Sequence, residues 1–142
     1  GIDGKITTVD PYFESKRQHL EMLTSVFPKE WFDKIEFVQS TSDNFFKDNK
    51  NKYDFIYIDG DHRYEAVKND WENSEDRFKK ILLFDDYHLP TKKMKDIECA
   101  DVIDAIEGYE KELIIMDRRI FFDDRRIKDE DIDYGQVLLT RW

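Results

Sequence analysis

The stretch that decides the fold is Tyr53-Asp-Phe-Ile-Tyr-Ile-Asp59-Gly60-Asp61-His62-Arg-Tyr64-Glu65, followed later by Ile81-Leu-Leu-Phe-Asp85-Asp86-Tyr87-His88. Each half is a short apolar run that ends at carboxylates, and one amphipathic segment of helix length separates the two halves. This pattern is typical of a strand–helix–strand unit. Open α/β sheets bind their ligands at the carboxyl ends of the strands. The sequence therefore predicts an α/β fold with a metal or catalytic site at that edge.

The composition indicates an acidic globular chain. Its 142 residues are 39% apolar and 15% aromatic, which is enough for one domain with a core, and we expect a single domain over residues 1–142. The formal net charge of −10 argues against a nucleic-acid partner, because such partners select a basic surface. No apolar run approaches 18 residues and the start lacks a signal-peptide pattern, so we expect a cytoplasmic protein without a membrane partner. The single cysteine, Cys99, excludes an intrachain disulfide and a cysteine-rich zinc site.

Apolar runs and helical periodicity alternate along the chain, which favours a parallel α/β sheet without internal repeats. A helix with Tyr64, Val67, Trp71 and Phe78 on one face is expected over residues 63–78, and Ile103 and Ile106 face inwards from another over 96–109. Pro28 is expected to end the helix over residues 12–27. The expected strands are 5–9, 35–38, 55–58, 81–84, 112–116 and 136–140, with a short helix or turn over 43–50 and a charged connection between the last two strands.

Three carboxylates form the candidate metal site. Asp59 follows one apolar strand, while Asp85 and Asp86 follow what should be the adjacent strand. Carboxylate oxygens are the ligands that Mg²⁺ and Mn²⁺ prefer, so these three residues and some waters can complete an octahedral site. The alternative is that Asp59 and Gly60 make a turn and that Asp85 and Asp86 cap the segment that follows.

His62 is the candidate general base, because it lies three residues beyond Asp59 and an unperturbed imidazole titrates close to neutral pH. A loop histidine bonded to a backbone carbonyl is the alternative, and His88 has a weaker case as a residue lining the cleft. Asp10 ends the first strand, where it can accept hydrogen bonds from ribose hydroxyls or cap the following helix. Ser42 and Asp43 offer small hydrogen-bonding groups at the end of the next strand.

The segment from Ile58 to Glu65, together with Leu83-Phe-Asp85-Asp86-Tyr87, resembles the class I S-adenosylmethionine-dependent methyltransferases. Within them it is most similar to the small-molecule O-methyltransferases, including metal-dependent enzymes that modify sugars. The resemblance covers residues 4 to about 102 and continues loosely to the end. It implies a Rossmann-like three-layer sandwich whose sheet is mostly parallel, with an antiparallel strand near the C-terminus.

The resemblance also implies roles for individual residues. Asp10 would bind the ribose of S-adenosylmethionine, while Ser42 and Asp43 would border its adenine. Asp59, Asp85 and Asp86 would hold Mg²⁺, which would grip a substrate diol. His62 would take the proton from the reacting hydroxyl, unless Asp59 does so, and Asp59 is counted with the cofactor-binding residues as well. The implied activity is therefore methyl transfer to an oxygen of a small hydroxylated molecule.

One departure from the family concerns the glycine-rich loop that cradles the methionine part of the cofactor. Gly1-Ile-Asp-Gly4 is not a G-x-G-x-x-G motif, and none occurs among the 5 glycines. The strand ending at Asp10 matches the second strand of the family, so we expect a chain truncated before its first strand. The strands ending at Asp10 and Asp59 would then flank an empty position, close together, or recruit a strand from a second copy.

Two other classes of function stay open at this stage. A non-catalytic α/β module would keep the fold but would have lost cofactor binding, and it differs from the enzyme in not binding S-adenosylmethionine. A metal-dependent phosphoesterase is suggested by Asp59-Gly-Asp61-His62, but it would need more histidine ligands, and none follows His88. Methyl transfer is therefore the leading prediction.

Overall fold

The computed structural model describes residues 4–88, 97–115 and 134–141. The chain divides into two compact units, residues 1–50 and residues 51–142, and each is described by itself. The predicted strands 112–116 and 136–140 lie within β5 (Glu110–Ile115) and β6 (Tyr134–Thr140), except for Met116, which lies outside the described residues together with the charged connection.

The first unit is built on two parallel strands. β1 (Ile6–Val9) pairs with β2 (Ile35–Val38), in register from Ile6 opposite Ile35 to Val9 opposite Val38. The predicted helix over residues 12–27 forms as a 3₁₀ turn, η1 (Phe13–Lys16), followed by α1 (Arg17–Val26). α2 (Lys29–Phe32), which was not predicted, follows Pro28, and α3 (Ser42–Asp48) follows β2. Pro28 is the N-cap residue of α2, so it both ends one helix and begins the next.

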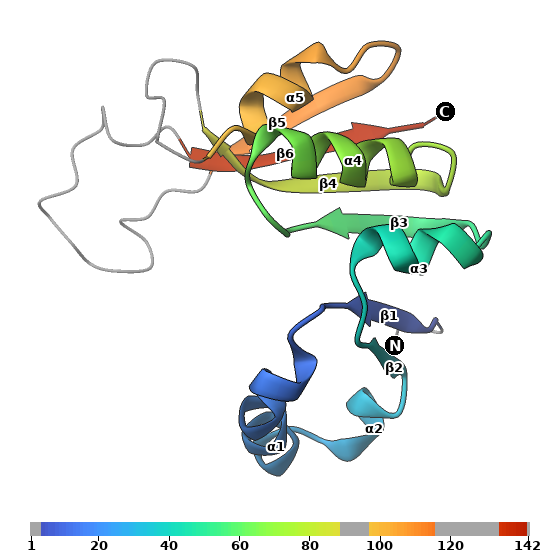
Figure 1. The fold of residues 1–142 in the computed structure, drawn as a ribbon, viewed down its shortest axis with the longest axis vertical. Helices are drawn as coiled ribbons and strands as arrows, with labels where there is room; N and C mark the ends of the chain where they lie inside the picture. Colours follow the sequence, from blue (N-terminus) through green and yellow to red (C-terminus); the bar gives the residue numbers. More distant parts are fainter. Residues whose placement is uncertain (1–3, 89–96, 116–133, 142) are drawn as a thin grey trace, which may run out of the picture. The chain divides into compact units, whose positions relative to one another are not determined.

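The second unit is a four-stranded sheet in the order β3-β4-β6-β5. β3 (Tyr53–Ile58) and β4 (Phe78–His88) run parallel, whereas β6 runs antiparallel to both β4 and β5. The mixed α/β class, with an antiparallel strand near the C-terminus, is therefore confirmed. α4 (Tyr64–Ser74) connects β3 to β4, and α5 (Cys99–Ala105) lies between β4 and β5 in the sequence (Figure 1).

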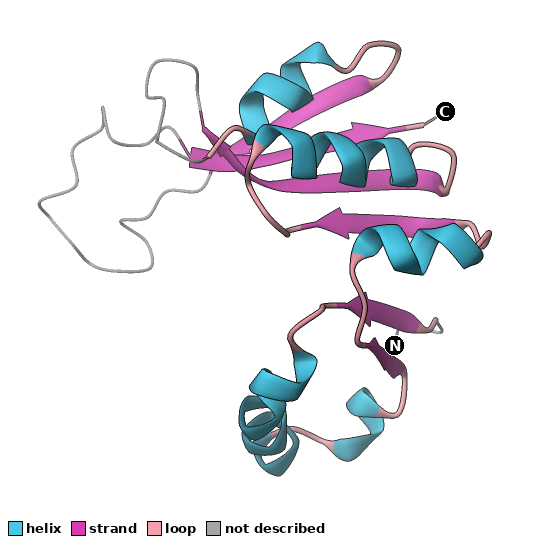
Figure 2. Cartoon of the chain, viewed as in Figure 1, coloured by secondary structure: helices cyan, strands magenta, loops and turns pink. Residues whose placement is uncertain are grey.

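The core of this unit lies between the sheet and its two helices, which pack on the same face (Figure 2). Leu82 pairs with Leu139 and Phe84 with Val137, so these four side chains point to one face and are buried. Val67 and Trp71 of α4 and Val102 and Ile103 of α5 cover them. Ile103 and Ile106 are both buried, as predicted. All the buried residues of the described chain belong to this second unit.

The prediction that Phe78 lies on the helix was wrong. α4 ends at Ser74, where the Arg77 N–H bonds to the Ser74 carbonyl and the Arg77 guanidinium donates to the Asn73 carbonyl. Those contacts satisfy carbonyls that the helix end leaves unpaired. Phe78 begins β4 and packs on Trp71 from the strand instead. The helical spacing from Tyr64 to Phe78 was therefore continued by a strand residue that reaches the same core.

Candidate functional site

The ends of β3 and β4 bring the predicted acids to one edge of the sheet. Ile58 is in register with Phe84 in the parallel pair, so the residues that follow them, Asp59 and Asp85, leave at the same edge. Asp59, His62 and Asp86 form a group in which one ligand atom from each lies within 4.8 Å of the others. We call this group the acidic-histidine cluster.

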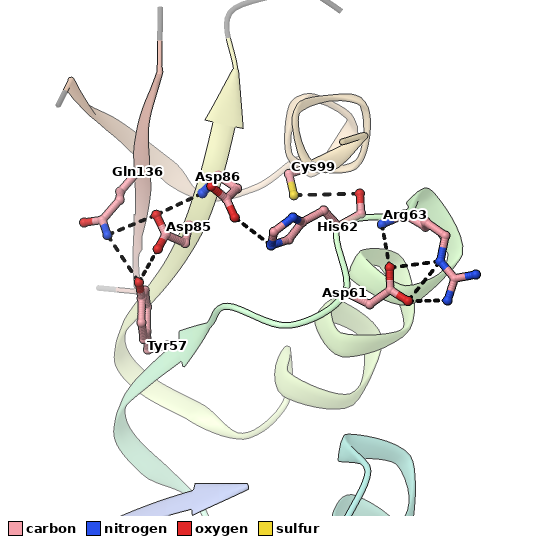
Figure 3. Close-up of polar contacts among 8 residues, drawn as sticks. All are labelled: Tyr57, Asp61, His62, Arg63, Asp85, Asp86, Cys99 and Gln136. Carbon is pink, nitrogen blue, oxygen red and sulfur yellow. Dashed lines mark hydrogen bonds and ion pairs between the residues drawn. The ribbon is translucent and has the colours of Figure 1, made fainter. Parts of the chain in front are cut away.

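The shortest contact in the cluster joins His62 to Asp86. Nε2 of His62 lies 2.6 Å from Oδ2 of Asp86, and the two side chains are 33% and 17% exposed (Figure 3). Because a carboxylate only accepts hydrogen bonds, Nε2 carries the proton in this pair and Nδ1 is the basic nitrogen. The pair is thus partly screened from water and still open to a ligand.

A bulge in β4 orients Asp86. Against β6, Phe84 pairs with Val137 but Tyr87 pairs with Gly135, so β4 carries one extra residue in this interval. Asp86 has a positive φ of 53°, in the left-handed region that aspartate tolerates better than most residues. Strain of this kind is often found at functional sites. The bulge breaks the alternation of the strand and turns Asp86 toward His62 (Figure 3).

Asp85 belongs to a different network. Its Oδ2 accepts a hydrogen bond from the Tyr57 hydroxyl, and its Oδ1 accepts from the Gln136 side chain at 3.2 Å and from the Asp86 N–H at 2.9 Å. Burial and the bond to Asp85 raise the pKa of Tyr57, so its hydroxyl stays a donor. The structure thus brings together Asp59, His62 and Asp86. Both oxygens of Asp85 are engaged by Tyr57 and Gln136 (Figure 3).

The loop between β3 and α4 holds His62 in a tight turn. The Asp61 carboxylate accepts from the Arg63 N–H at 3.1 Å and pairs with the Arg63 guanidinium. The bonds from Arg63 lower the pKa of Asp61 to about 2. Gly60 fits closely against α4, because an added Cβ would lie 3.2 Å from Oδ2 of Asp70. Asp61 therefore shapes the loop and is not part of the cluster.

Cys99 lies behind His62 and carries no nucleophilic character. Its Sγ lies 4.0 Å from the His62 carbonyl oxygen, and the side chain is buried. Burial, followed by the charge of Asp86, raises the pKa of the Cys99 thiol to about 12. The thiolate is the reactive form, so this cysteine packs rather than reacts at neutral pH. His88 is also buried, at the end of β4, and is not a member of the cluster.

The predicted cofactor residues of the first unit lie at the ends of its two strands. Asp10 follows β1, and its carboxylate accepts from the Tyr12 N–H at 2.6 Å, so it does cap the next turn. Thr41 is the N-cap residue of α3, and Ser42 and Asp43 are in the first turn. β1 and β2 are parallel, so all three residues belong to one edge of this unit. Their roles in binding a cofactor stay predictions.

Sequence reasoning missed Tyr57 and Gln136 as partners of Asp85. Tyr57 carries a weak signal, because strand alternation places it on the face opposite to Ile56 and Ile58. Gln136 carries none, since it is 51 residues away from Asp85 and meets it only through the pairing of β4 with β6. A bulge cannot be read from two adjacent aspartates, so the division of labour between Asp85 and Asp86 was also missed.

Comparisons with solved structures show that this fold is shared with larger proteins. A protein from Corynebacterium glutamicum has a TM-score of 0.58 and 15% identity, over 96% of this chain and 60% of its own. An O-methyltransferase from Bacillus cereus in complex with SAH has a TM-score of 0.60 and 10% identity, over 99% of this chain and 64% of its own. A protein described as an rRNA methylase from Clostridium thermocellum has a TM-score of 0.63 and 11% identity, over 100% of this chain and 77% of its own. The chain thus spans less than two thirds of the first two.

No curated protein matches the chain in sequence. A sequence model of one protein family does match it, over residues 1–87, and that family is described as a methyltransferase domain. The match covers more than half of the 142 residues and ends just beyond Asp85 and Asp86, so it includes both strand ends of the candidate site. On this evidence the chain belongs to the methyltransferase-domain family.

Proposed function

We propose that this protein binds S-adenosylmethionine and transfers its methyl group to a hydroxyl oxygen of a small molecule. The observation that carries the proposal is the 2.6 Å contact between His62 and Asp86 at the carboxyl edge of the β3–β4 pair, in a chain of the methyltransferase-domain family. That edge is where open α/β sheets bind ligands, and a histidine–carboxylate pair is a suitable proton acceptor.

In the proposed reaction, the acceptor oxygen forms a bond to the methyl carbon as the carbon–sulfur bond of the sulfonium breaks. The proton of the hydroxyl passes to Nδ1 of His62, and Asp86 stabilises the imidazolium that forms, because its carboxylate lies on Nε2. Much of the rate would come from holding the oxygen in line with the methyl group. Asp59 is the other candidate base, since it belongs to the same cluster.

A divalent cation fits the donors of the cluster. Asp59 and Asp86 offer carboxylate oxygens, which suit Mg²⁺ or Mn²⁺, and Oδ1 of Asp86 can serve the metal while Oδ2 holds His62. Such an ion would lower the pKa of a bound hydroxyl and orient it. We propose Asp59 and Asp86 as the protein ligands. The resemblance added Asp85, whose oxygens are engaged by Tyr57 and Gln136.

The metal assignment predicts different behaviour for the two adjacent aspartates. Asp86→Asn should weaken Mn²⁺ binding by about a hundredfold, because a neutral amide replaces a charged carboxylate ligand, whereas Asp85→Asn should weaken it by about tenfold. Electron paramagnetic resonance of free Mn²⁺ measures both dissociation constants. Equal losses in the two variants would make Asp85 a direct ligand, and no binding by the unmodified protein would remove the metal from the proposal.

A small hydroxylated molecule is a better candidate than RNA for the methyl acceptor. One structural neighbour is described as an rRNA methylase. This chain, however, carries a net charge of −10, and RNA-binding surfaces need clustered positive charge. No helix in the described part of the chain is long and apolar enough to cross a membrane.

The first test is titration calorimetry of the purified chain with S-adenosylhomocysteine, with and without Mg²⁺. Binding with a micromolar dissociation constant would support S-adenosylmethionine as the cofactor. No heat from a sample that is folded by circular dichroism would instead favour the second candidate, a non-catalytic module.

We also propose that two copies of the chain associate through β3. In the described sheet β3 is an edge strand, next to β4 alone, and an edge strand is a ready template for pairing with another chain. Phe55 and Tyr57 on this strand are 52% and 44% exposed, which gives such an interface apolar area. Light scattering after size exclusion should show a dimer or larger species, and a strict monomer at all concentrations would contradict the proposal.

A further inference from the structure

The N-terminal end of α5 makes contact with the loop that carries His62. The Glu98 N–H donates to the His62 carbonyl oxygen at 2.8 Å. The Cys99 thiol lies 4.0 Å from the same oxygen (Figure 3). The Glu98 carboxylate accepts a hydrogen bond from the Tyr64 N–H at 2.8 Å. Glu98 therefore touches both residues that flank Arg63, one through its backbone and one through its side chain.

The bond between the Glu98 carboxylate and the Tyr64 N–H caps the N-terminus of α4 with a side chain from outside that helix. Tyr64 is the first residue of α4, and its N-cap residue, Arg63, makes no side-chain capping bond. The first N–H groups of a helix need acceptors, and a negative charge is favourable at the positive end of the helix dipole. The Glu98 carboxylate meets both needs. It ties the start of α4 to the start of α5, so the loop between β3 and α4 cannot move independently of α5.

The Glu98 carboxylate and the Glu98 backbone N–H bind the same loop, so the carboxylate's bond to Tyr64 also keeps the backbone N–H against the His62 carbonyl oxygen. The His62 ring is held on one side by Asp86, at 2.6 Å from Nε2. The backbone of the same residue is held on the opposite side by Glu98, at 2.8 Å from the carbonyl oxygen. If the second contact loosens, the ring can leave Asp86, and a displaced catalytic group loses rate steeply with distance.

We propose that Glu98 is a positioning residue for methyl transfer, which fixes His62 against Asp86 without touching substrate. The inference rests on the proposed function, since it assumes that His62 takes the proton. It assigns to the segment before α5 a role in the reaction rather than in cofactor binding.

The test compares Glu98→Ala and Glu98→Gln with a matched control, Glu75→Ala. Gln keeps an oxygen that can accept from Tyr64, whereas Ala does not. Glu75 is the C-cap residue of the same helix, and its carboxylate accepts a hydrogen bond from outside the helix, from the Tyr109 hydroxyl at 3.1 Å. Both alanine variants therefore remove a glutamate bond at an end of α4, but only one is beside His62.

Two readouts separate positioning from general stability. Glu98→Ala should lower kcat by about tenfold to a hundredfold with an unchanged KM for S-adenosylmethionine, and Glu98→Gln should recover most of kcat. Hydrogen exchange at the amides of residues 63–66 should become at least about tenfold faster in Glu98→Ala and should stay unchanged in Glu75→Ala. The exchange measurement needs no activity, so it can be read even if the proposed function fails.

Several outcomes would overturn the inference. Equal kcat values for Glu98→Ala and the unmodified protein would show that the position of His62 does not depend on the Glu98 carboxylate. Equal losses in Glu98→Ala and Glu75→Ala would show a stability effect alone. Unchanged exchange at residues 63–66 would show that the contact does not hold the loop. If the unmodified protein transfers no methyl group but hydrogen exchange is faster in Glu98→Ala, the contact of Glu98 with the loop is supported and the proposed methyl transfer is refuted.

Discussion

Replacing His62 with glutamine is expected to lower kcat for methyl transfer by about two to four orders of magnitude, the usual contribution of a positioned general base. Glutamine has a similar size and can still bond to Asp86, but it cannot accept a proton from a hydroxyl. The acidic limb of the kcat–pH profile should also disappear in this variant, because that limb reports the protonation of the base. Binding of S-adenosylhomocysteine should stay within about threefold.

Asp61→Asn is the matched control for this variant. Asp61 lies in the same loop, but it bonds to Arg63 and is not a member of the acidic-histidine cluster. It should therefore keep kcat within about a few-fold. If His62→Gln retains full activity and an unchanged pH profile, His62 is not the base, and Asp59, the other candidate in the cluster, becomes the residue to substitute.

The largest expected loss of stability comes from Phe78→Ala. Phe78 is 1% exposed, and its ring centroid lies 6.3 Å from that of Trp71 and 5.5 Å from that of Tyr109. The Arg141 guanidinium lies over the same ring, 4.5 Å from its centroid. Removal of a buried phenylalanine costs about 3–5 kcal/mol of unfolding free energy, because a cavity remains. Urea denaturation followed by circular dichroism measures this change.

Phe55→Ala provides the comparison for Phe78→Ala. Phe55 is 52% exposed on the adjacent strand, so its removal should change the unfolding free energy of the monomer, measured at concentrations too low for the proposed β3 dimer, by about 0.5 kcal/mol or less. Phe78 begins the strand that carries Asp86 eight residues later, about 25 Å away at the rise of a β-strand. Folded Phe78→Ala should therefore keep its kcat. Similar unfolding free energies for the two variants would contradict the assignment of Phe78 to the core.

The sequence was informative where apolar runs ended at charged residues. The runs before Asp59 and before Asp85 were predicted to be strands, and the helix-length segment between them favoured a parallel pair, so the edge of the site could be predicted. The boundaries were less predictable. β4 extends from Phe78 to His88 rather than over residues 81–84, since Lys79 and Lys80 keep strand geometry while they pair with Asp54 at the surface.

The division of roles within the site depended on geometry that single-residue patterns do not carry. Asp85 and Asp86 are equivalent in sequence, but Asp85 binds Tyr57 and Gln136, whereas Asp86, at the one-residue bulge, lies against His62. Likewise, nothing in the sequence near His62 indicates Glu98, because the contact spans two helices that meet only in the folded chain.

The bulge at Asp86 also decides which changes this site can tolerate. Because side chains alternate along a strand with a period of two, Phe84 and Tyr87 would point to opposite faces of a regular strand, and the extra residue between them lets both reach the core. Deletion of Asp86 would restore the regular ladder and remove the positive φ, yet it would also remove the carboxylate that lies on His62. A more regular strand at this position would lack the contact between Asp86 and His62, so insertions and deletions there should reduce activity more than most substitutions do.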